Sequence, residues 1–518
     1  MDRKWWTLIA VCTGVFMLLI DVTVVNTALP AIQRSLHSSF SDLQWVINAY
    51  ALTLAAFLLT AGSLSDLLGR KRVFASGLAL FTISSLLCGF AQTPAMLNLA
   101  RGAQGIGGAV MLSSSLALIA NAFRGADRGA AFAVYGAVLG AAVAVGPLVG
   151  GGITSAIGWR WIFFVNVPIG VLAIALTATR VNESRGPAGR RIDWFGLVSF
   201  SASLFLLVYA LTQANGAGWG SAKIVSCLAG AVALLAAFVV AELRQRDPMF
   251  DLALLRRPAF AGASVVGFAL SASIFSLYLY LTLYIQNVLG YSPFQSGLRF
   301  LPMTIVMFFI APISGRMTVK LPVRLILSTG LVLVGVSLVL MAGISAGSGY
   351  SHLLAGFLVG GLGIGMITPA LASTAVAVVA PAQAGTASGI NSTFRQVGIA
   401  TGVAALGAIF QHVVASHTLA GLRRSGDAAA VARATHGQLA STFASGSTGR
   451  LAASLPAPLR RVVVGAFDHA FASALNEILL IAAVVAAIGA VAGLVLVRSR
   501  DFVSGQPASA AQPAGAPA

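Results

Sequence analysis

The chain contains fourteen apolar stretches, and these constrain its fold more than any other feature of the sequence. Each stretch is long enough to cross about 30 Å of hydrocarbon as a helix. Because lipid offers no partner to backbone N–H and C=O groups, a chain that crosses a bilayer this often does so as helices. We predict spans over residues 6–30, 43–63, 73–92, 95–123, 130–156, 161–179, 194–213, 222–241, 259–287, 296–316, 324–343, 352–372, 385–411 and 474–497.

The composition agrees with lipid as the solvent for most of the chain. Of the 518 residues, 58% are hydrophobic and only 9% are charged, whereas soluble domains carry about 25% charged residues. The 56 glycines would let helices pack closely within a membrane. The predicted fold class is therefore an all-α integral membrane protein. The three cysteines lie far apart in apolar runs and indicate neither a disulfide framework nor a metal site.

The net charge of +18 would suggest nucleic-acid binding in a soluble protein, but its distribution favours a topology signal. With a cytoplasmic N-terminus, twenty Lys or Arg residues fall in the short inner segments and four in the short outer ones. This bias predicts a multi-pass protein of the cell membrane with both termini in the cytoplasm and no nucleic-acid partner. Loop 412–473 would lie outside, and the Pro- and Ala-rich tail 501–518 would be disordered and cytoplasmic.

A weak internal repeat suggests two related halves. The segment Gly62–Arg72 after the second span has a counterpart 253 residues later, where Gly315 matches Gly62 but Val319 replaces Asp66. Repeats packed around a central site are common in secondary transporters. We therefore expect an N-terminal bundle, an inserted pair of helices and a C-terminal bundle, at 6–179, 194–241 and 258–497.

Short motifs occur in order along most of the chain. They are Leu19–Pro30, Trp45–Tyr50, Gly62–Arg72, Arg101–Gly108, Gly146–Gly151, Trp159–Pro168, Gly290–Pro302 and Phe394–Gln396. In this order and topology they resemble the major facilitator superfamily and, within it, the fourteen-helix branch of drug:proton antiporters. The resemblance implies two six-helix bundles plus two inserted helices, with the bundles rocking about a central cavity.

The resemblance also implies a function, a proton-coupled secondary active exporter of small amphipathic compounds, with drugs or antibiotics as the expected substrates. Alternatives are an exporter of a lipid, siderophore or peptide, or a proton symporter. A membrane-embedded enzyme is a distant third reading, because the spans hold one deep acid and no His, Cys and Ser cluster. No G-x-x-x-x-G-K-[ST] loop occurs, so the proton gradient, and no cofactor, would supply the energy.

The expected partners are a small-molecule substrate, protons and the lipid bilayer, with a periplasmic adaptor if the cell is Gram-negative. The sequence leaves the oligomeric state open.

Asp21 is the one acid deep within a predicted span. A carboxylate at this depth costs on the order of 3 kcal/mol on insertion scales, so its presence requires a reason. Arg101, on a polar face with Gln104, is its natural partner. We predict that Asp21 carries the coupled proton and that Arg101 tunes it, a role the resemblance also implies for this arginine. The alternative is a fixed structural ion pair.

A second candidate is the loop after span 2, with Gly62 and Gly69 allowing a tight turn. The resemblance places Asp66 beside the start of span 13, near Gly385–Gly389, where backbone N–H groups attract an anion. Arg70 would then reach Asp127 and hold the inner side closed. An ordinary basic inner loop is the alternative, but it explains neither Asp66 nor the glycine spacing.

The resemblance identifies an antiporter signature in span 5, formed by Gly146, Pro147, Gly150 and Gly151. Small residues here would allow close helix contact, and Pro147 would kink the helix. Either this kink biases which side opens, or the segment is a plain packing face.

The remaining candidates could line a substrate cavity. Arg395 lies near the middle of span 13 without an acid at that depth in the second half, so substrate contact, conformational switching and snorkelling all stay open. For the span 9 aromatics, contact with lipid or neighbouring helices is the alternative. The candidates are Asn26, Tyr50, Gln104, Tyr280, Tyr284, Asn391 and Arg395; no residue is assigned to a metal or cofactor.

Overall fold

The computed structural model describes residues 2–123, 125–185, 193–245, 248, 250–345, 347–379, 384–425 and 456–498. Within them it has fourteen helices, or runs of joined helices, long and apolar enough to cross a membrane, which confirms the predicted fold class. Helix starts follow local signals. For example, Ser39 caps the second long helix in a reciprocal capping box with Asp42.

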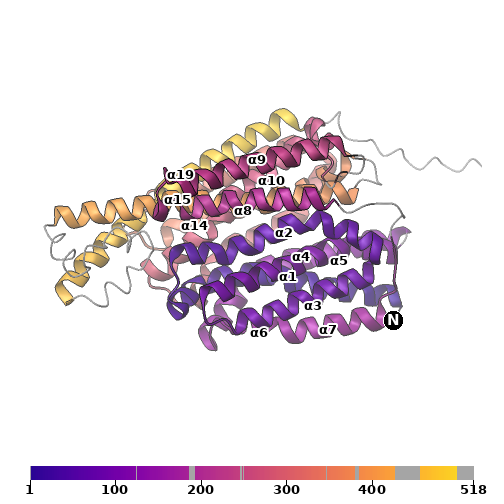
Figure 1. Ribbon diagram of the computed structural model, residues 1–518, viewed down its shortest axis with the longest axis horizontal. Helices are drawn as coiled ribbons and strands as arrows, with labels where there is room; N and C mark the ends of the chain where they lie inside the picture. Colours follow the sequence, from indigo (N-terminus) through magenta and orange to yellow (C-terminus); the bar gives the residue numbers. More distant parts are fainter. Residues whose placement is uncertain are drawn as a thin grey trace, which may run out of the picture.

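The first six spans pack against one another as one bundle (Figure 1). Its sixth span is broken at Val165 into two helices, which the sequence pattern did not reveal. The helices are α1 (Arg3–Leu36), α2 (Phe40–Leu68), α3 (Arg70–Gly89), α4 (Pro94–Ala122), α5 (Gly125–Ala156), α6 (Trp161–Phe164) and α7 (Asn166–Arg180).

The last six spans form a second bundle beside the first. Its first span was predicted as one stretch at 259–287, but two π-helical turns interrupt it. The elements are α10 (Pro258–Leu270), η2 (Ser271–Phe275), α11 (Ser276–Leu283), η3 (Tyr284–Val288), α12 (Pro293–Lys320), α13 (Val323–Met341), α14 (Ser351–Ala377), α15 (Ala384–Arg424) and α19 (Ala457–Leu496). Such π-turns are rare and often mark functional sites.

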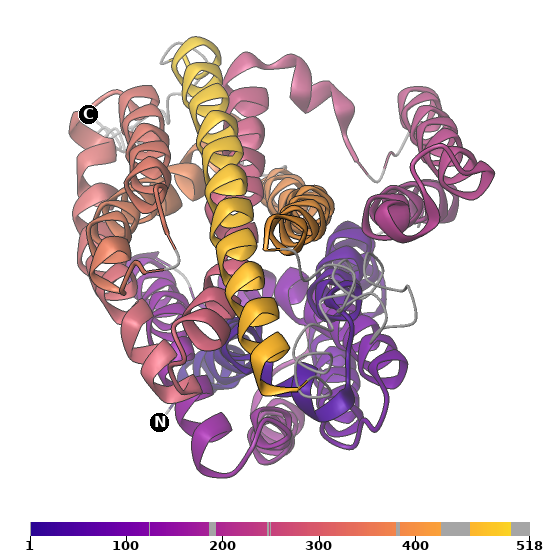
Figure 2. The same ribbon diagram turned by 90° about the vertical axis from the view of Figure 1, so that its left-hand side faces the viewer.

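Two further helices, α8 (Trp194–Ala217) and α9 (Ala222–Arg244), form the inserted pair. They lie at the edge of the molecule, at the right in the end view of Figure 2. Helix α8 packs against α2 of the first bundle and α15 of the second. A short 3-10 turn, η1 (Leu252–Arg256), precedes the second bundle. The pair therefore covers one of the two lateral seams between the bundles.

The predicted loop 412–473 is partly helical. Helix α15 continues to Arg424 and α19 already begins at Ala457, and these extensions project beyond the bundles at the left of Figure 1. Leu422 and Val463 are fully buried between them. This correction has a simple cause, because an Ala- and Arg-rich helix outside the membrane lacks the hydropathy of a span. Residues 426–455 and the predicted tail 501–518 lie outside the described residues.

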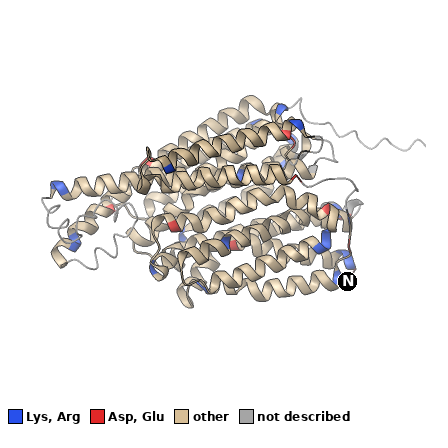
Figure 3. Cartoon of the chain, viewed as in Figure 1, with Lys and Arg blue, Asp and Glu red and all other residues tan. Residues whose placement is uncertain are grey.

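Charged residues lie mostly toward the ends of the helices, and few lie between those ends (Figure 3). Asp21 and Arg101 are among those few, and both are buried. A charge at this depth is either paired or reaches water within the protein. The position of each such group therefore defines the candidate site.

Candidate functional site

The structure joins Asp21 and Arg101 directly. The Arg101 Nη1 nitrogen donates to the Asp21 Oδ2 oxygen at 2.5 Å, and both residues are at most 2% exposed. Gln104 links the two, because its amide nitrogen donates to Asp21 Oδ1 at 3.0 Å while its amide oxygen accepts from Arg101 at 2.7 Å. The predicted contact is therefore present, and it is sealed from solvent.

The surroundings hold the Arg101 side chain in place. Its Nε donates to the Val46 carbonyl at 3.2 Å, and the centre of its guanidinium lies 4.3 Å from the Tyr50 ring centroid. Gly105 permits this approach of α4 to α2, because a methyl group there would overlap the Tyr50 carbonyl oxygen. The Tyr50 hydroxyl itself is buried and has no partner among the described residues. Tyr50 thus contributes its ring to the charge pair.

Sequence reasoning missed two members of this network. The Asn166 amide nitrogen donates to Asp21 Oδ1 at 3.1 Å and to the Ser85 hydroxyl at 3.0 Å. Ser85 in turn donates to the Phe163 carbonyl at 2.9 Å, next to the break between α6 and α7. The signal available in the sequence was Asn166, a polar residue about one turn inside the apolar span 161–179. Asp21 therefore accepts hydrogen bonds from three side chains.

Arg395 has a different environment. Its Cγ lies against Gly267 of α10, and it makes no ion pair or hydrogen bond with any described residue. Its Nε is buried without a partner, while the residue as a whole is partly exposed. The second bundle thus contains a membrane-depth cation that no described carboxylate neutralises.

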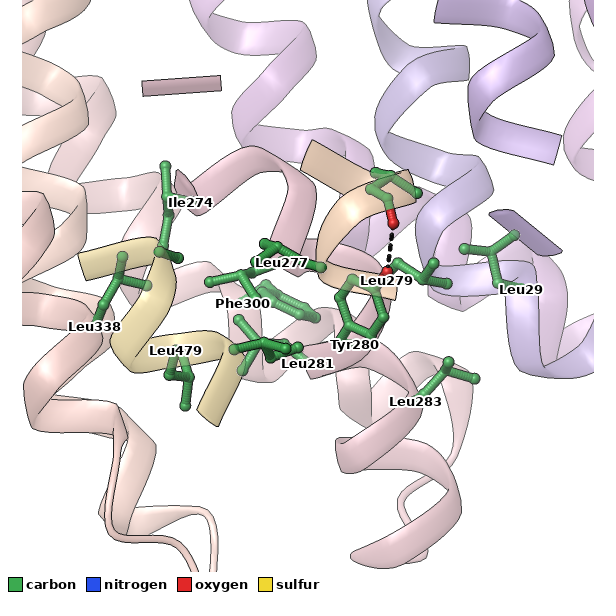
Figure 4. Close-up of a cluster of buried hydrophobic side chains, with 14 of the residues drawn as sticks. Leu29, Ile274, Leu277, Leu279, Tyr280, Leu281, Leu283, Phe300, Leu338 and Leu479 are labelled. Carbon is green, nitrogen blue, oxygen red and sulfur yellow. Dashed lines mark hydrogen bonds between the residues drawn. The ribbon is translucent and has the colours of Figure 1, made fainter. Parts of the chain in front are cut away.

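Other candidates for the substrate cavity are packed in the core. Tyr280 is fully buried and donates to the Val403 carbonyl at 2.7 Å, the bond drawn in Figure 4. Tyr284 is 1% exposed and donates to the Ser348 carbonyl. Asn391 is also buried, with its amide on the Ala263 carbonyl at 3.4 Å. In this structure the polar groups of these three residues bond to backbone carbonyls, and their role in a substrate cavity stays a prediction.

Asn26 is partly exposed, and its amide only donates to the Val22 carbonyl one turn earlier at 3.0 Å. Of the cavity candidates, the structure brings Tyr50 and Gln104 to the Asp21–Arg101 pair. It leaves Asn26 and Arg395 outside that network.

The loop after α2 forms different ion pairs from those predicted. Arg70 binds Asp66 one turn away, at 2.9 Å, and does not reach Asp127, which instead accepts from Lys4 at 2.7 Å. The contact of Asp66 with the start of α15, near Gly385–Gly389, stays a prediction. Gly69 has the positive φ of 107° expected of a tight turn, whereas Gly62 lies inside α2 with open space around it.

A residue that sequence reasoning missed holds this loop. The Glu183 carboxylate accepts from the backbone N–H of Lys71 at 3.0 Å and of Arg72 at 3.3 Å, at the first turn of α3. A carboxylate at a helix N-terminus is favoured by the unpaired N–H groups and the helix dipole. The carboxylate at the start of α3 is therefore that of Glu183, which follows α7 in the same bundle.

The predicted antiporter signature lies where α5 packs against two other helices, α1 and α12. Methyl groups at Gly146 or Gly150 would overlap Thr23 or Thr27 of α1. On the other side the contact between α5 and α12 is reciprocal. Gly151 lies against the Pro293 carbonyl, and Gly297 lies against the Pro147 carbonyl. The pattern Pro-x-x-x-Gly occurs in both helices and was the signal available in the sequence.

The seam between α5 and α12 loosens away from this contact. A methyl group at Gly140 would be 3.7 Å from Phe308, and at Gly136 it would meet nothing within 4 Å. At the tight end, further bonds tie the bundles together. Ser155 accepts from the Phe294 N–H at 2.9 Å, and Gln286 donates to the Thr27 carbonyl at 2.8 Å. The bundles are therefore closed at the end opposite the N-terminus.

Comparisons with known proteins agree with this architecture. The family model described as Major Facilitator Superfamily matches residues 11–403. The chain is 35% identical to the multidrug resistance protein Stp of Mycobacterium tuberculosis over 78% of this chain and 75% of that protein. It is 36% identical to the tetracenomycin C resistance and export protein of Streptomyces glaucescens, over 79% and 76% of the two chains.

The fold also has close structural neighbours. A bacterial homologue of the human lysosomal transporter Spinster has a TM-score of 0.64 at 16% identity, covering 98% of this chain and all of that one. Two six-span bundles with an inserted pair, together with the family match, define a multi-pass membrane transporter and not an enzyme. The chain belongs to the major facilitator superfamily.

Proposed function

We propose that this chain is a proton-coupled exporter of small amphipathic compounds, drugs or antibiotics among them, and that it works by alternating access. The names of the relatives, which refer to drug resistance and export, support the substrate class. The main observation that supports proton coupling is the buried Asp21–Arg101 pair, in which Asp21 is a membrane-depth carboxyl that can hold a proton. The positive-inside bias supports both termini in the cytoplasm of the cell membrane.

In this proposal Asp21 takes up a proton when the closed end opens. Protonation removes the charge that Arg101 binds, so the contact between α1 and α4 weakens. Rearrangement of α1 against α5 at Gly146 and Gly150 then accompanies the change of access. Release of the proton on the other side restores the pair, and substrate moves in the opposite direction.

The loop at Gly62–Arg72 is proposed as the inner gate. Asp66 and Arg70 pair with each other in this structure, in which the opposite end is closed. The proposal is that these two residues separate when the inner side closes. Asp66 then binds the start of α15, and Arg70 binds Asp127. The fixed anion Glu183 keeps the loop on its own bundle during that exchange.

The test uses the purified chain in proteoliposomes with a trapped pH-sensitive dye. Adding a transported compound should move protons, and an imposed pH gradient should drive its efflux. Asp21→Asn mimics the protonated carboxyl, so it should bind compound but lose proton-driven efflux, while Asp66→Asn should slow efflux and keep the coupling. Efflux that stays proton-driven in Asp21→Asn would falsify the assignment.

Compounds for that assay come from a susceptibility screen. A host lacking its own pumps, with and without this chain, should show raised resistance to the exported compounds. The Asp21→Asn chain, produced at equal level in the membrane, should give no resistance. A screen without any protected compound would count against drug export.

A further inference from the structure

The two membrane-depth arginines leave the interior with one uncompensated positive charge. Arg101 and Asp21 neutralise each other, and both are buried. Arg395 lies eleven residues into α15, about 16 Å along the helix at 1.5 Å per residue, which places it at membrane depth. Among the described residues it has no ion pair and no hydrogen bond.

The packing of α15 sets the direction of this side chain. Arg395 Cγ lies against Gly267 of α10, where an added methyl group would be 3.2 Å away, and Leu371 of α14 lies beside the same glycine. Helix α10 belongs to the most enclosed of the described spans. The stem of Arg395 therefore packs inside the second bundle, while the residue as a whole remains partly exposed.

The chemistry of a guanidinium identifies what would pair with the exposed part of this side chain. An arginine in the membrane is costly unless it is paired or hydrated. Its planar fork matches carboxylate, sulfonate and similar oxyanions, and such charge-assisted hydrogen bonds are strong. An oxyanion on a bound compound would also satisfy the cation, whereas a purely apolar compound would leave it unpaired.

The same arrangement disfavours cationic compounds. A binding site for an organic cation usually supplies an acid or an aromatic cage. Asp21, the acid at membrane depth among the described residues, is 1% exposed and accepts from Arg101, Gln104 and Asn166. It has no free face for a ligand, so a cation entering this interior meets an unbalanced positive charge.

We infer that Arg395 is a substrate-binding residue and that it selects amphiphiles carrying an oxyanion, such as an organic carboxylate or sulfonate. This inference rests on the proposed export function and gives it a substrate class. Gly267 has a part in it, because a larger residue there would displace the base of the arginine side chain.

The experiment compares two probes of nearly the same shape, dansyl sulfonate, which is anionic, and dansylamide, which is neutral. Ethidium serves as the cation. Binding is measured by equilibrium dialysis against the full chain in nanodiscs, with empty nanodiscs subtracted, and transport by probe-induced proton movement in proteoliposomes. The variants are Arg395→Gln, Arg395→Lys and the control Arg316→Gln, which removes an exposed positive charge from α12.

The unaltered chain should bind the sulfonate at least ten-fold more tightly than the amide, and ethidium least. Arg395→Gln should remove that ten-fold preference without weakening amide binding, Arg395→Lys should keep part of it, and Arg316→Gln should keep all of it. Amide binding in Arg395→Gln shows that the variant is folded.

An undiminished sulfonate preference in Arg395→Gln overturns the inference, and so does tighter binding of ethidium than of the sulfonate. If the amide drives proton movement and the sulfonate does not, the inference fails while the export proposal stands. If none of the three probes moves protons, and compounds from the susceptibility screen do not either, the export proposal itself fails.

Discussion

Arg101 and Arg395 are the same side chain at membrane depth in two different environments. Arg101 is held by a carboxylate, an amide, a backbone carbonyl and an aromatic ring, and is 2% exposed. Arg395 packs its stem against Gly267, its Nε is buried without a partner among the described residues, and the residue is partly exposed. The first bundle therefore neutralises its membrane-depth arginine with its own carboxylate, whereas the second leaves Arg395 without a charged partner among the described residues.

The largest expected effect is on stability and concerns Arg101→Gln. This change leaves Asp21 buried without its cation, which costs about 3–5 kcal/mol. The same change at Arg395 removes a cation that has no partner, so its effect should be near zero or stabilising. Thermal unfolding in detergent, followed by the fraction that stays monodisperse, measures both.

A double variant provides the control. Asp21→Asn with Arg101→Gln removes both charges and should recover most of the lost stability, since no uncompensated charge remains. Equal destabilisation by Arg101→Gln and Arg395→Gln would break the comparison, because it would mean that Arg395 also has an essential partner.

A smaller effect is expected for Asn166→Ala. It removes one of the three donors to Asp21 and leaves the Ser85 hydroxyl without its donor, which should cost about 1–3 kcal/mol. The same unfolding assay measures it, with Asn26→Ala as a matched control, because that amide only bonds within its own helix. A loss no greater than that of the control would show that Asn166 is not part of the charge site.

The smallest effect concerns Tyr50→Phe. The ring stacks on Arg101, but the hydroxyl is buried and has no partner among the described residues, so its loss should change stability by no more than about 0.5 kcal/mol. Tyr50→Leu removes the ring and should be clearly worse. If Tyr50→Phe were as damaging as Tyr50→Leu, the hydroxyl would have a role that the packing does not reveal.

The Asp21–Arg101 contact was predictable from the sequence because both residues are rare at membrane depth and the order of spans brings them to the same level. In this structure Arg70 pairs with Asp66 and not with the predicted Asp127, because an i,i+4 pair forms within the same turn and needs no contact between segments. Glu183 could not be assigned at all, since its role depends on where the segment after α7 returns to α3.

The same reasoning explains the aromatic residues. Hydropathy located span 9 but gave no direction to Tyr280, whose hydroxyl turns to a backbone carbonyl of α15. The π-turns at Ser271–Phe275 and Tyr284–Val288 shift the face of each following residue, and no periodicity in the sequence marks them. Side-chain direction in that span was therefore beyond a helical-wheel argument.

The reciprocal contact between Pro147–Gly151 and Pro293–Gly297 also has a consequence for the speed of transport. Where side chains of two helices interdigitate, they have to change rotamer before the helices can move past each other, and this raises the activation barrier. Here main chain rests on main chain, with glycine on each side, so no rotamers have to exchange when one bundle tilts against the other. We therefore expect this contact to add little to the barrier for tilting, and the nearby Ser155–Phe294 and Gln286–Thr27 hydrogen bonds to add more.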